Sequence, residues 1–287
     1  MMRIGMPLLC SFAWIAVGVA QTASPTIKSP VAVDRVLPSG DVFAVSSDKK
    51  VYQLHDDGTL LQPINTFSIP AYRSPSDLTT AIVNGEQVMI VSGLSQGAGF
   101  IDIYDVRGKQ TGTWRSTHVL SGVDYSPGND MIYAASSDSN EIYQVRAGAS
   151  DDRVAFLSEI SGARHLGPVL FDGRRNRLIV GEIDEGQIYA LDLKTHRSHL
   201  IAHGLGSPQA LMLSADANHL YVADSSRRAI YTVDLINENS TPTLFSKATQ
   251  FREPVGLVPL GSGRIGVADD RADKIFIITS QGSLQNP

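Results

Sequence analysis

The chain has 287 residues, a formal net charge of −5 and a single cysteine. It contains no run rich in lysine and arginine, which argues against a nucleic-acid partner, because phosphates require a clustered basic surface. A chain of this length can bury enough apolar surface to fold without disulfide bonds.

Residues 1–20 have the pattern of a secretory signal peptide. Arg3 supplies a positive charge before the apolar run Pro7–Ala20, which ends in small residues suited to cleavage before Gln21. The run is short for a membrane span, so we expect cleavage, export to the periplasm or the medium, and no membrane span in the mature chain. An uncleaved N-terminal anchor is the alternative. Cleavage would remove Cys10 and leave no thiol for catalysis or metal binding.

The rest of the chain repeats one unit six times. In each copy a run rich in β-branched or aromatic residues is followed by a polar turn and a second such run. The second runs begin at positions 51, 100, 142, 188, 230 and 275, and the differences are 49, 42, 46, 42 and 45 residues. In chain order the pairs are Asp41–Ser46 with Val51–Leu54, Gln87–Gly93 with Phe100–Tyr104, Met131–Ser136 with Ile142–Val145, Arg177–Glu182 with Ile188–Leu193, His219–Asp224 with Ile230–Leu235, and Arg264–Asp269 with Ile275–Ile278.

A third, inner strand precedes each pair, and an outer strand follows most pairs. A period in the forties with several strands per unit is typical of propeller blades, so the sequence predicts an all-β domain, a six-bladed β-propeller, over residues 30–287. The predicted inner strands are Pro30–Val33, Pro75–Leu78, Leu120–Val123, Leu166–Val169, Pro208–Leu211 and Pro254–Leu257. The predicted outer strands are Thr59–Ile64, Val154–Glu159, His199–His203 and Thr243–Ser246.

The last copy has little chain left for an outer strand, because Gly282–Pro287 is short and polar. The N-terminal arm, residues 21–29, could supply that strand through Ala23–Lys28 and close the ring. The alternative is a three-stranded last blade beside a loose arm, since terminal segments are often untethered.

Two stretches carry a family resemblance: HLYVADSSRRAIYTVDL (His219–Leu235) and RIGVADDRADKIF (Arg264–Phe276). They resemble blades of the six-bladed propellers of the gluconolactonase/senescence-marker-protein and NHL-repeat group, which are TolB-like propellers. The same blade serves hydrolases, lyases and binding modules, so the resemblance predicts the fold but not the function.

In the lactonases of that group, the resemblance implies a divalent metal at the top of the central channel. Its Glu, Asn and Asp ligands follow the first residue of the inner-strand motif. Neutral ligands alone scarcely offset the dehydration of Ca²⁺, so we expect neither a metal nor another cofactor in this chain. Asp77 and Asp124 lie nearby, but further along their strands, where the pleat should turn their side chains elsewhere. The equivalent positions here are Val31, Ser76, Ser121, Gly167, Gln209 and Val255, none of them acidic.

A second pattern lies three residues before these positions, where five of the six copies carry a basic residue. An electropositive rim of this kind would attract a carboxylate, sulfate or phosphate group to the channel mouth. The alternative is ion pairing with acids of neighbouring turns (Asp48, Asp138, Glu182, Asp224 and Asp269), which stabilises a surface only slightly. The five residues of the predicted rim are Lys28, Arg73, His118, Arg164 and Arg252.

Two functions remain open from the sequence. The first is an exported, non-catalytic binding or scaffold propeller with a basic channel mouth, whose partner is an anionic small molecule or a protein at the channel face. The second is a diverged lactonase or lyase that uses the channel residues Ser76, Ser121 and Gln209. The missing acidic ligands favour the first function.

Overall fold

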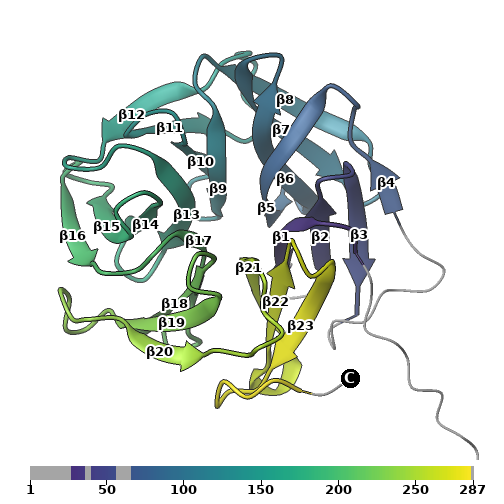
Figure 1. Ribbon diagram of the computed structural model, residues 1–287. Helices are drawn as coiled ribbons and strands as arrows, with labels where there is room; N and C mark the ends of the chain where they lie inside the picture. Colours follow the sequence, from purple (N-terminus) through teal and green to yellow (C-terminus); the bar gives the residue numbers. More distant parts are fainter. Residues whose placement is uncertain (1–26, 36–39, 56–65, 286–287) are drawn as a thin grey trace, which may run out of the picture.

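The computed structural model describes residues 27–35, 40–55 and 66–285, which form six antiparallel sheets around a central channel (Figure 1). The prediction of an all-β, six-bladed β-propeller is confirmed. Within each sheet the strands follow one another in chain order from the channel outward, so the first strand of every blade lines the channel. No helix in the described part of the chain is long and apolar enough to cross a membrane.

Blades 1 to 3 each contain four strands. Blade 2 has the longest strands, and its outer strand β8 was not foreseen in the sequence. The predicted outer strand Thr59–Ile64 of blade 1 lies outside the described residues. The strands are β1 (Pro30–Arg35), β2 (Val42–Ser46), β3 (Lys50–Leu54) and β4 (Thr66–Ser68) in blade 1; β5 (Arg73–Val83), β6 (Glu86–Ser95), β7 (Ala98–Asp105) and β8 (Gln110–Ser116) in blade 2; and β9 (Leu120–Ser126), β10 (Met131–Ser136), β11 (Glu141–Arg146) and β12 (Ala155–Glu159) in blade 3.

Blades 4 and 5 also contain four strands, whereas blade 6 contains three among the described residues. The predicted strand pairs agree with the structure to within a few residues. The strands are β13 (Leu166–Asp172), β14 (Arg177–Glu182), β15 (Gln187–Asp192) and β16 (Ser198–Ala202) in blade 4; β17 (Pro208–Leu213), β18 (His219–Asp224), β19 (Ala229–Asp234) and β20 (Thr243–Ser246) in blade 5; and β21 (Pro254–Pro259), β22 (Ile265–Asp269) and β23 (Lys274–Ile278) in blade 6.

The outer edge of blade 6 is partly covered by the C-terminal residues. Leu284 forms an antiparallel bridge with Ile278, and the N–H of Gln285 donates to the carbonyl of Ile277 at 2.8 Å. The predicted closing strand, Ala23–Lys28, lies outside the described residues except for its last two positions. Of these, Ile27 is fully buried in the apolar cluster between blades 6 and 1.

The hydrophobic core is divided into six clusters, one between each pair of neighbouring blades. Alternate residues of the middle strands face opposite neighbours, so both faces of each sheet are buried. Ile132 packs towards blade 2 and Tyr133 towards blade 4, for example. Each fully buried Ile, Leu or Val side chain contributes about 1.5–3 kcal/mol. No blade could bury both faces alone, so the ring depends on all six.

Every inner strand has a register irregularity near its start, where it pairs with the second strand: after the first residue in five blades, and after the third residue, Pro75, in blade 2. One residue in the inner strand is left over at this bulge, except in blade 4, where two are. A β-bulge bends the strand and re-aims the side chain of the extra residue. The leftover residues are Val31, Ser76, Ser121, Gly167 with Pro168, Gln209 and Val255.

Candidate functional site

The six positions compared with metal ligands in the sequence lie together at one end of the channel. They line a single cavity of about 350 Å³ at the channel mouth. The bulge in every blade turns a leftover residue near the start of the inner strand towards this cavity, which explains why positions so far apart in the chain converge. We call it the mouth cavity. It is bordered by Val31, Ser76, Ser121, Gly167, Gln209 and Val255, together with Asp77, Ser137, Pro168, Ile183, Glu253 and Asp270.

The candidate channel residues Ser76, Ser121 and Gln209 are therefore brought together. The hydroxyl of Ser121 can donate to the backbone carbonyls of Leu166 and Gly167 in blade 4, at 2.8 and 3.2 Å. The side-chain amide of Gln209 donates to the Ser207 hydroxyl at 3.0 Å within its own blade. Ser121 thus joins two blades at the mouth, while Gln209 is held in place at the cavity wall.

Arg73 departs from the predicted basic rim. Its side chain is only 2% exposed, and the guanidinium donates to Asp102 at 3.1 Å and to the Thr113 hydroxyl at the same distance. It also lies over the ring of Phe100, 4.3 Å from the centroid. The long strands of blade 2 cover the guanidinium, so Arg73 is a buried structural residue and does not reach the channel mouth.

The other four rim residues are at the surface, in two different situations. The ring of His118 pairs with Asp138 at 3.2 Å and with Glu141 at 3.5 Å, so it forms the ion pair that the alternative interpretation expected. In contrast, Lys28, Arg164 and Arg252 are exposed, and none of them makes an ion pair with another described residue. None of the five rim residues borders the mouth cavity.

The turn acids that were expected to pair with the rim mainly accept hydrogen bonds from backbone N–H groups. Asp224 is fully buried and accepts hydrogen bonds from the N–H groups of Gly206 and Ser207, at 2.7 and 3.1 Å. Asp269 is equally buried and accepts the N–H of Arg252 at 2.8 Å. These two carboxylates fix the loops that lead into β17 and β21, because they satisfy N–H groups that no strand pairs.

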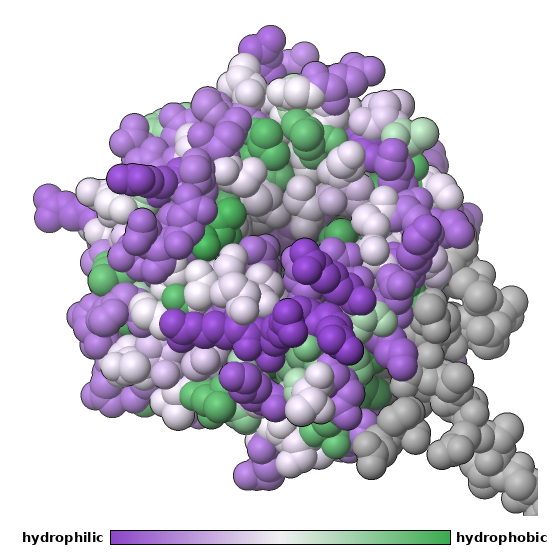
Figure 2. Space-filling model, viewed as in Figure 1, coloured by the Kyte–Doolittle hydropathy of each residue, from purple (hydrophilic) through white to green (hydrophobic). Residues whose placement is uncertain are grey.

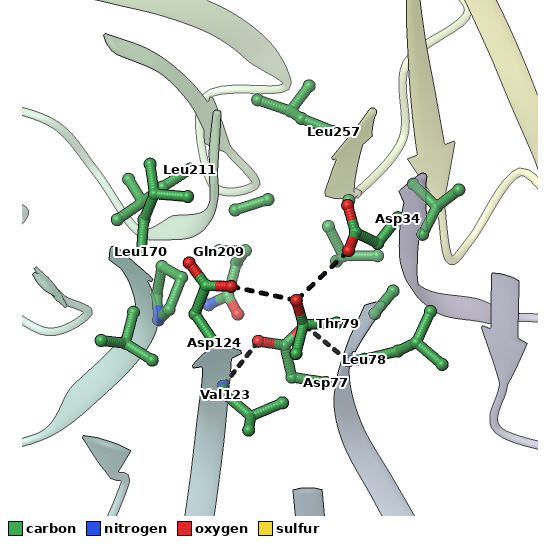
Figure 3. A pocket seen from close by; sticks show the side chains of 17 residues that line it. Asp34, Asp77, Leu78, Thr79, Val123, Asp124, Leu170, Gln209, Leu211 and Leu257 are labelled. Atoms are coloured by element: carbon green, nitrogen blue, oxygen red, sulfur yellow. Dashed lines mark hydrogen bonds between the residues drawn. The ribbon is translucent and has the colours of Figure 1, made fainter. Parts of the chain in front are cut away.

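Below the mouth, three carboxylates line a narrower cavity of about 70 Å³ (Figure 3). Each accepts a backbone N–H from the inner strand of the next blade. Asp34 accepts from Thr80 at 2.7 Å, Asp77 from Val123 at 2.9 Å, and Asp124 from Phe171 at 2.6 Å. We call Asp34, Asp77 and Asp124 the carboxylate ladder. It joins the inner strands of blades 1, 2, 3 and 4 in sequence.

Thr79 lies between two members of the carboxylate ladder. Its hydroxyl oxygen is 3.2 Å from a carboxyl oxygen of Asp34 and 3.0 Å from one of Asp124 (Figure 3). One hydroxyl has a single proton to donate. Both contacts are hydrogen bonds only if one of the two carboxyl groups is itself protonated and donates to Thr79.

The electrostatics of the channel agree with this proton sharing. Burial, together with the neighbouring carboxylates, raises the pKa of Asp77 to about 8 and the pKa of Asp124 to about 7. Burial also raises the pKa of Asp34. Backbone N–H donors oppose each of these increases without cancelling them. At neutral pH part of the carboxylate ladder is therefore protonated.

The ladder was missed in the sequence because of the bulge. The pleat was expected to turn Asp77 and Asp124 away, but the extra residue shifts the alternation, and both side chains face the channel. A usable signal was present: Asp34 and Asp124 each lie within an inner strand directly after a valine, where an acid is rarely buried without a specific partner.

The residues of the channel do not fit the divalent metal that the resemblance implies. The bulge positions offer no carboxylate, and the ladder carboxylates already accept backbone N–H groups. No group of three or more His, Cys, Asp or Glu side chains in the described part of the chain is arranged to hold a metal ion.

The lining of the mouth is acidic and polar. Asp77, Glu253 and Asp270 border the mouth cavity, and no lysine, arginine or histidine among the described residues does. Glu253 is paired with Arg271 at 2.5 Å. Strongly hydrophilic side chains border the hollow at the centre of the face in view, on the side of β22 and β23 (Figure 2). The basic character expected of the channel mouth is therefore confined to exposed side chains outside the cavity.

Comparison with known proteins supports the same fold. Residues 162–286 match the family described as the SMP-30/gluconolactonase/LRE-like region. No curated protein sequence matches the chain. A structural genomics protein of unknown function from Bacteroides thetaiotaomicron superposes with a TM-score of 0.68 at 12% identity, covering 88% of this chain and 70% of that protein. A chain of the nidogen/laminin complex superposes with a TM-score of 0.70 at 14% identity, covering 85% of this chain and 92% of that one.

At these identities the structural matches show the fold alone. The family match begins just before β13 and extends over blades 4 to 6. The resemblance to six-bladed propellers of the gluconolactonase group is thus confirmed: in fold for the whole ring, and in sequence for its C-terminal half.

Proposed function

We propose that this chain is an exported, non-catalytic binding propeller that takes a small polar ligand in the mouth cavity. One observation carries the proposal. The six bulge positions meet around one cavity, yet they present hydroxyl, amide and apolar groups, where the resemblance to lactonases implies Glu, Asn and Asp ligands. A concave site with a few convergent polar groups suits ligand binding without a metal.

The chemistry of the lining suggests the class of ligand. Ser76, Ser137 and Gln209 offer neutral hydrogen-bonding groups, while Val31 and Val255 offer apolar contacts. The acids of the mouth cavity disfavour an anion inside it, because no basic side chain from the described part of the chain lines it. We therefore propose an uncharged ligand rich in hydroxyl or amide groups. The anionic partner expected from the sequence would have to bind outside the cavity, at Arg164 and Arg252.

Titration calorimetry with neutral sugars, polyols and aldonolactones tests this proposal. Gln209→Leu and Ser76→Val should each weaken the binding of a bound probe about tenfold, because each removes a hydrogen-bonding group from the cavity wall. Gln281→Leu changes an exposed glutamine far from the channel and should leave affinity unchanged. Binding that none of these variants alters would show that the mouth cavity is not the site.

A diverged lactonase is the second candidate, and two observations favour it. The family match covers blades 4 to 6, and Asp77 lies on the wall of the mouth cavity with its pKa raised to about 8, so it can donate or accept a proton near neutral pH. Hydrolysis of gluconolactone by the purified protein, lost in Asp77→Asn but retained in Gln281→Leu, would establish this function instead.

A further inference from the structure

We infer that three residues of the channel wall, Asp34, Thr79 and Asp124, form a pH-sensitive switch that joins the inner strands of blades 1, 2 and 3 (Figure 3). We call these residues the proton clasp. While the clasp holds a proton it keeps the three strands together, and when that proton is lost the strands separate locally at the channel. Its role does not depend on the function proposed for the mouth cavity.

The clasp is built around one hydroxyl group. Oγ1 of Thr79 on β5 lies 3.2 Å from Oδ2 of Asp34 on β1 and 3.0 Å from Oδ1 of Asp124 on β9. Because a hydroxyl group has one proton to donate, two hydrogen bonds at this oxygen require that one of the acids donates the second. The geometry of the contacts therefore places a proton on the pair of acids.

The other contacts of the two acids place this proton on Asp124. Oδ2 of Asp34 already accepts the N–H and the hydroxyl of Thr80, at 2.7 and 2.9 Å. An oxygen that faces three donors suits an ionised carboxylate, which only accepts. Asp124 therefore donates to Thr79, and Thr79 donates to Asp34. Oδ2 of Asp124 remains free to accept the N–H of Phe171 at 2.6 Å.

The charged groups beside the clasp on its own strands do not neutralise it. Asp77 of β5 also lines the narrow cavity and adds a third acid. Arg73 of the same strand is paired with Asp102 and is buried away from the channel. Arg35, next to Asp34 on β1, donates to a backbone carbonyl of blade 6 at 3.3 Å and does not line the cavity.

The strands across the channel supply no positive charge either. β17 and β21 contain no charged residue. The one acid of β13, Asp172, pairs with Arg175 and Arg177, and none of these three lines the narrow cavity. The charged residues that the mouth cavity adds, Glu253 and Asp270, are again acids. A second negative charge in the clasp would therefore be opposed by neighbouring charges of the same sign.

The ionisation behaviour of the acids agrees with a retained proton. Burial raises the pKa of Asp124 to about 7, and it raises the pKa of Asp34 as well. In an open, hydrated channel both acids would have pKa values near about 4. Between about pH 4 and pH 7 the closed clasp thus binds a proton that the open form does not. Opening should become easier as the pH rises through this range, and should level off above it.

The clasp is accessible to protons from the mouth of the channel. Asp34 and Asp124 are both partly exposed, and the narrow cavity shares wall residues with the mouth cavity, among them Asp77, Gln209 and Val255. Local separation of the strands would let water into the narrow cavity and widen the channel beneath the mouth. The clasp therefore makes the shape of the channel depend on pH.

Amide hydrogen exchange followed by NMR tests the clasp without any ligand. The reporters are the N–H groups of Thr80, bound to Asp34, and of Phe171, bound to Asp124. Their protection factors, corrected for the intrinsic effect of pH on exchange, should fall about tenfold per pH unit between pH 5 and pH 7 and then level off.

The response to urea separates local opening from unfolding of the whole ring. At pH 7 low concentrations of urea should hardly alter exchange at Thr80 and Phe171, because local opening exposes little surface, but should accelerate exchange in the buried middle strand β14. Reporter protection that is independent of pH, or that depends on urea as steeply as protection in β14, would overturn the inference.

Asp124→Asn tests the proton itself. The Asn side chain is neutral at every pH, can donate to Thr79 and can still accept the N–H of Phe171, so it imitates the closed clasp. Protection of Thr80 and Phe171 should then stay at its pH 5 level up to pH 7. Glu159→Gln, which removes an exposed acid of β12, is the matched control and should keep the wild-type pH dependence.

An Asp124→Asn variant that retains the wild-type pH dependence would also overturn the inference. The exchange measurements on the wild-type protein decide the question even if this variant does not fold.

Discussion

The narrow cavity of the channel is lined by Asp34, Asp77, Thr79 and Asp124 on the side of blades 1 to 3, whereas blades 4 to 6 line it mainly with apolar side chains, among them Leu170, Leu211 and Leu257. The same channel is thus polar on one side and apolar on the other, as Figure 3 shows for the carboxylate ladder opposite Leu170, Leu211 and Leu257. The polar side joins its strands through carboxylate-to-backbone hydrogen bonds. On the apolar side, Leu170 and Leu211 pack in the cluster between blades 4 and 5.

The two halves also differ in their relation to the family. The match covers the apolar half, residues 162–286, while the carboxylate ladder and the buried Arg73 lie in the other half. Equivalent positions of a repeat therefore do not have equivalent roles. The role of a residue in one blade predicts the role of its counterpart in another blade only where both are equally buried, because burial decides whether a charge must be paired.

Arg73 and Arg164 give the largest expected contrast. They occupy the same repeat position, but Arg73 is buried against Asp102 and Arg164 is exposed. Arg73→Ala should lower the free energy of unfolding by about 3–5 kcal/mol, because it leaves Asp102 buried without its ion-pair partner. Arg164→Ala should change it by less than about 0.5 kcal/mol. Urea denaturation measures both, and equal losses would remove the distinction between the halves.

The carboxylate ladder should give a smaller effect that depends on pH. The pKa values of Asp77 and Asp124 are raised to about 8 and about 7 in the fold. An acid whose pKa is higher in the folded state than in the unfolded chain contributes stability at low pH, and loses it as the pH rises through the folded value. The melting temperature should therefore fall between about pH 4 and pH 8 through these groups.

Asp77→Asn combined with Asp124→Asn should flatten that decline and raise the melting temperature at pH 8 by about 2–4 °C. Leu170→Met, on the apolar side, should leave the pH dependence as it is. The sign of the change in melting temperature at pH 8 is the critical result. A double variant that is destabilised relative to wild type at pH 8, but not at pH 5, would mean that the charged ladder stabilises the ring.

The exposed rim should give the smallest effect. Arg164→Ala with Arg252→Ala should reduce the affinity for inorganic sulfate by a factor of a few, and raising the salt concentration should remove the difference, because exposed charges are screened within about 8 Å at physiological ionic strength. Stability should not change measurably. Sulfate binding that is unaffected by the double substitution would leave the rim without an anion-binding role.

The sequence was sufficient to predict the six-bladed ring, but not which side chains line its channel. The alternation of apolar residues and the regular period located the inner and middle strands of every blade, since both patterns follow directly from burial on two faces. The prediction that Arg73 belongs to the basic rim was wrong, because its repeat position gives no information about the long strands of blade 2, which bury it. Asp34, Asp77 and Asp124 were missed because a one-residue bulge reverses the facing of every later side chain.

The central claim is that the mouth cavity of this propeller binds without a metal. Thermal denaturation of the purified protein, measured with a chelator and again with millimolar Ca²⁺, tests it most directly. A ligand that binds only the folded state raises stability in proportion to its affinity. We predict the same melting temperature in both conditions, because the six bulge positions carry no carboxylate. A rise of several degrees with Ca²⁺, accompanied by lactone hydrolysis and lost in Gln209→Leu, would contradict the claim.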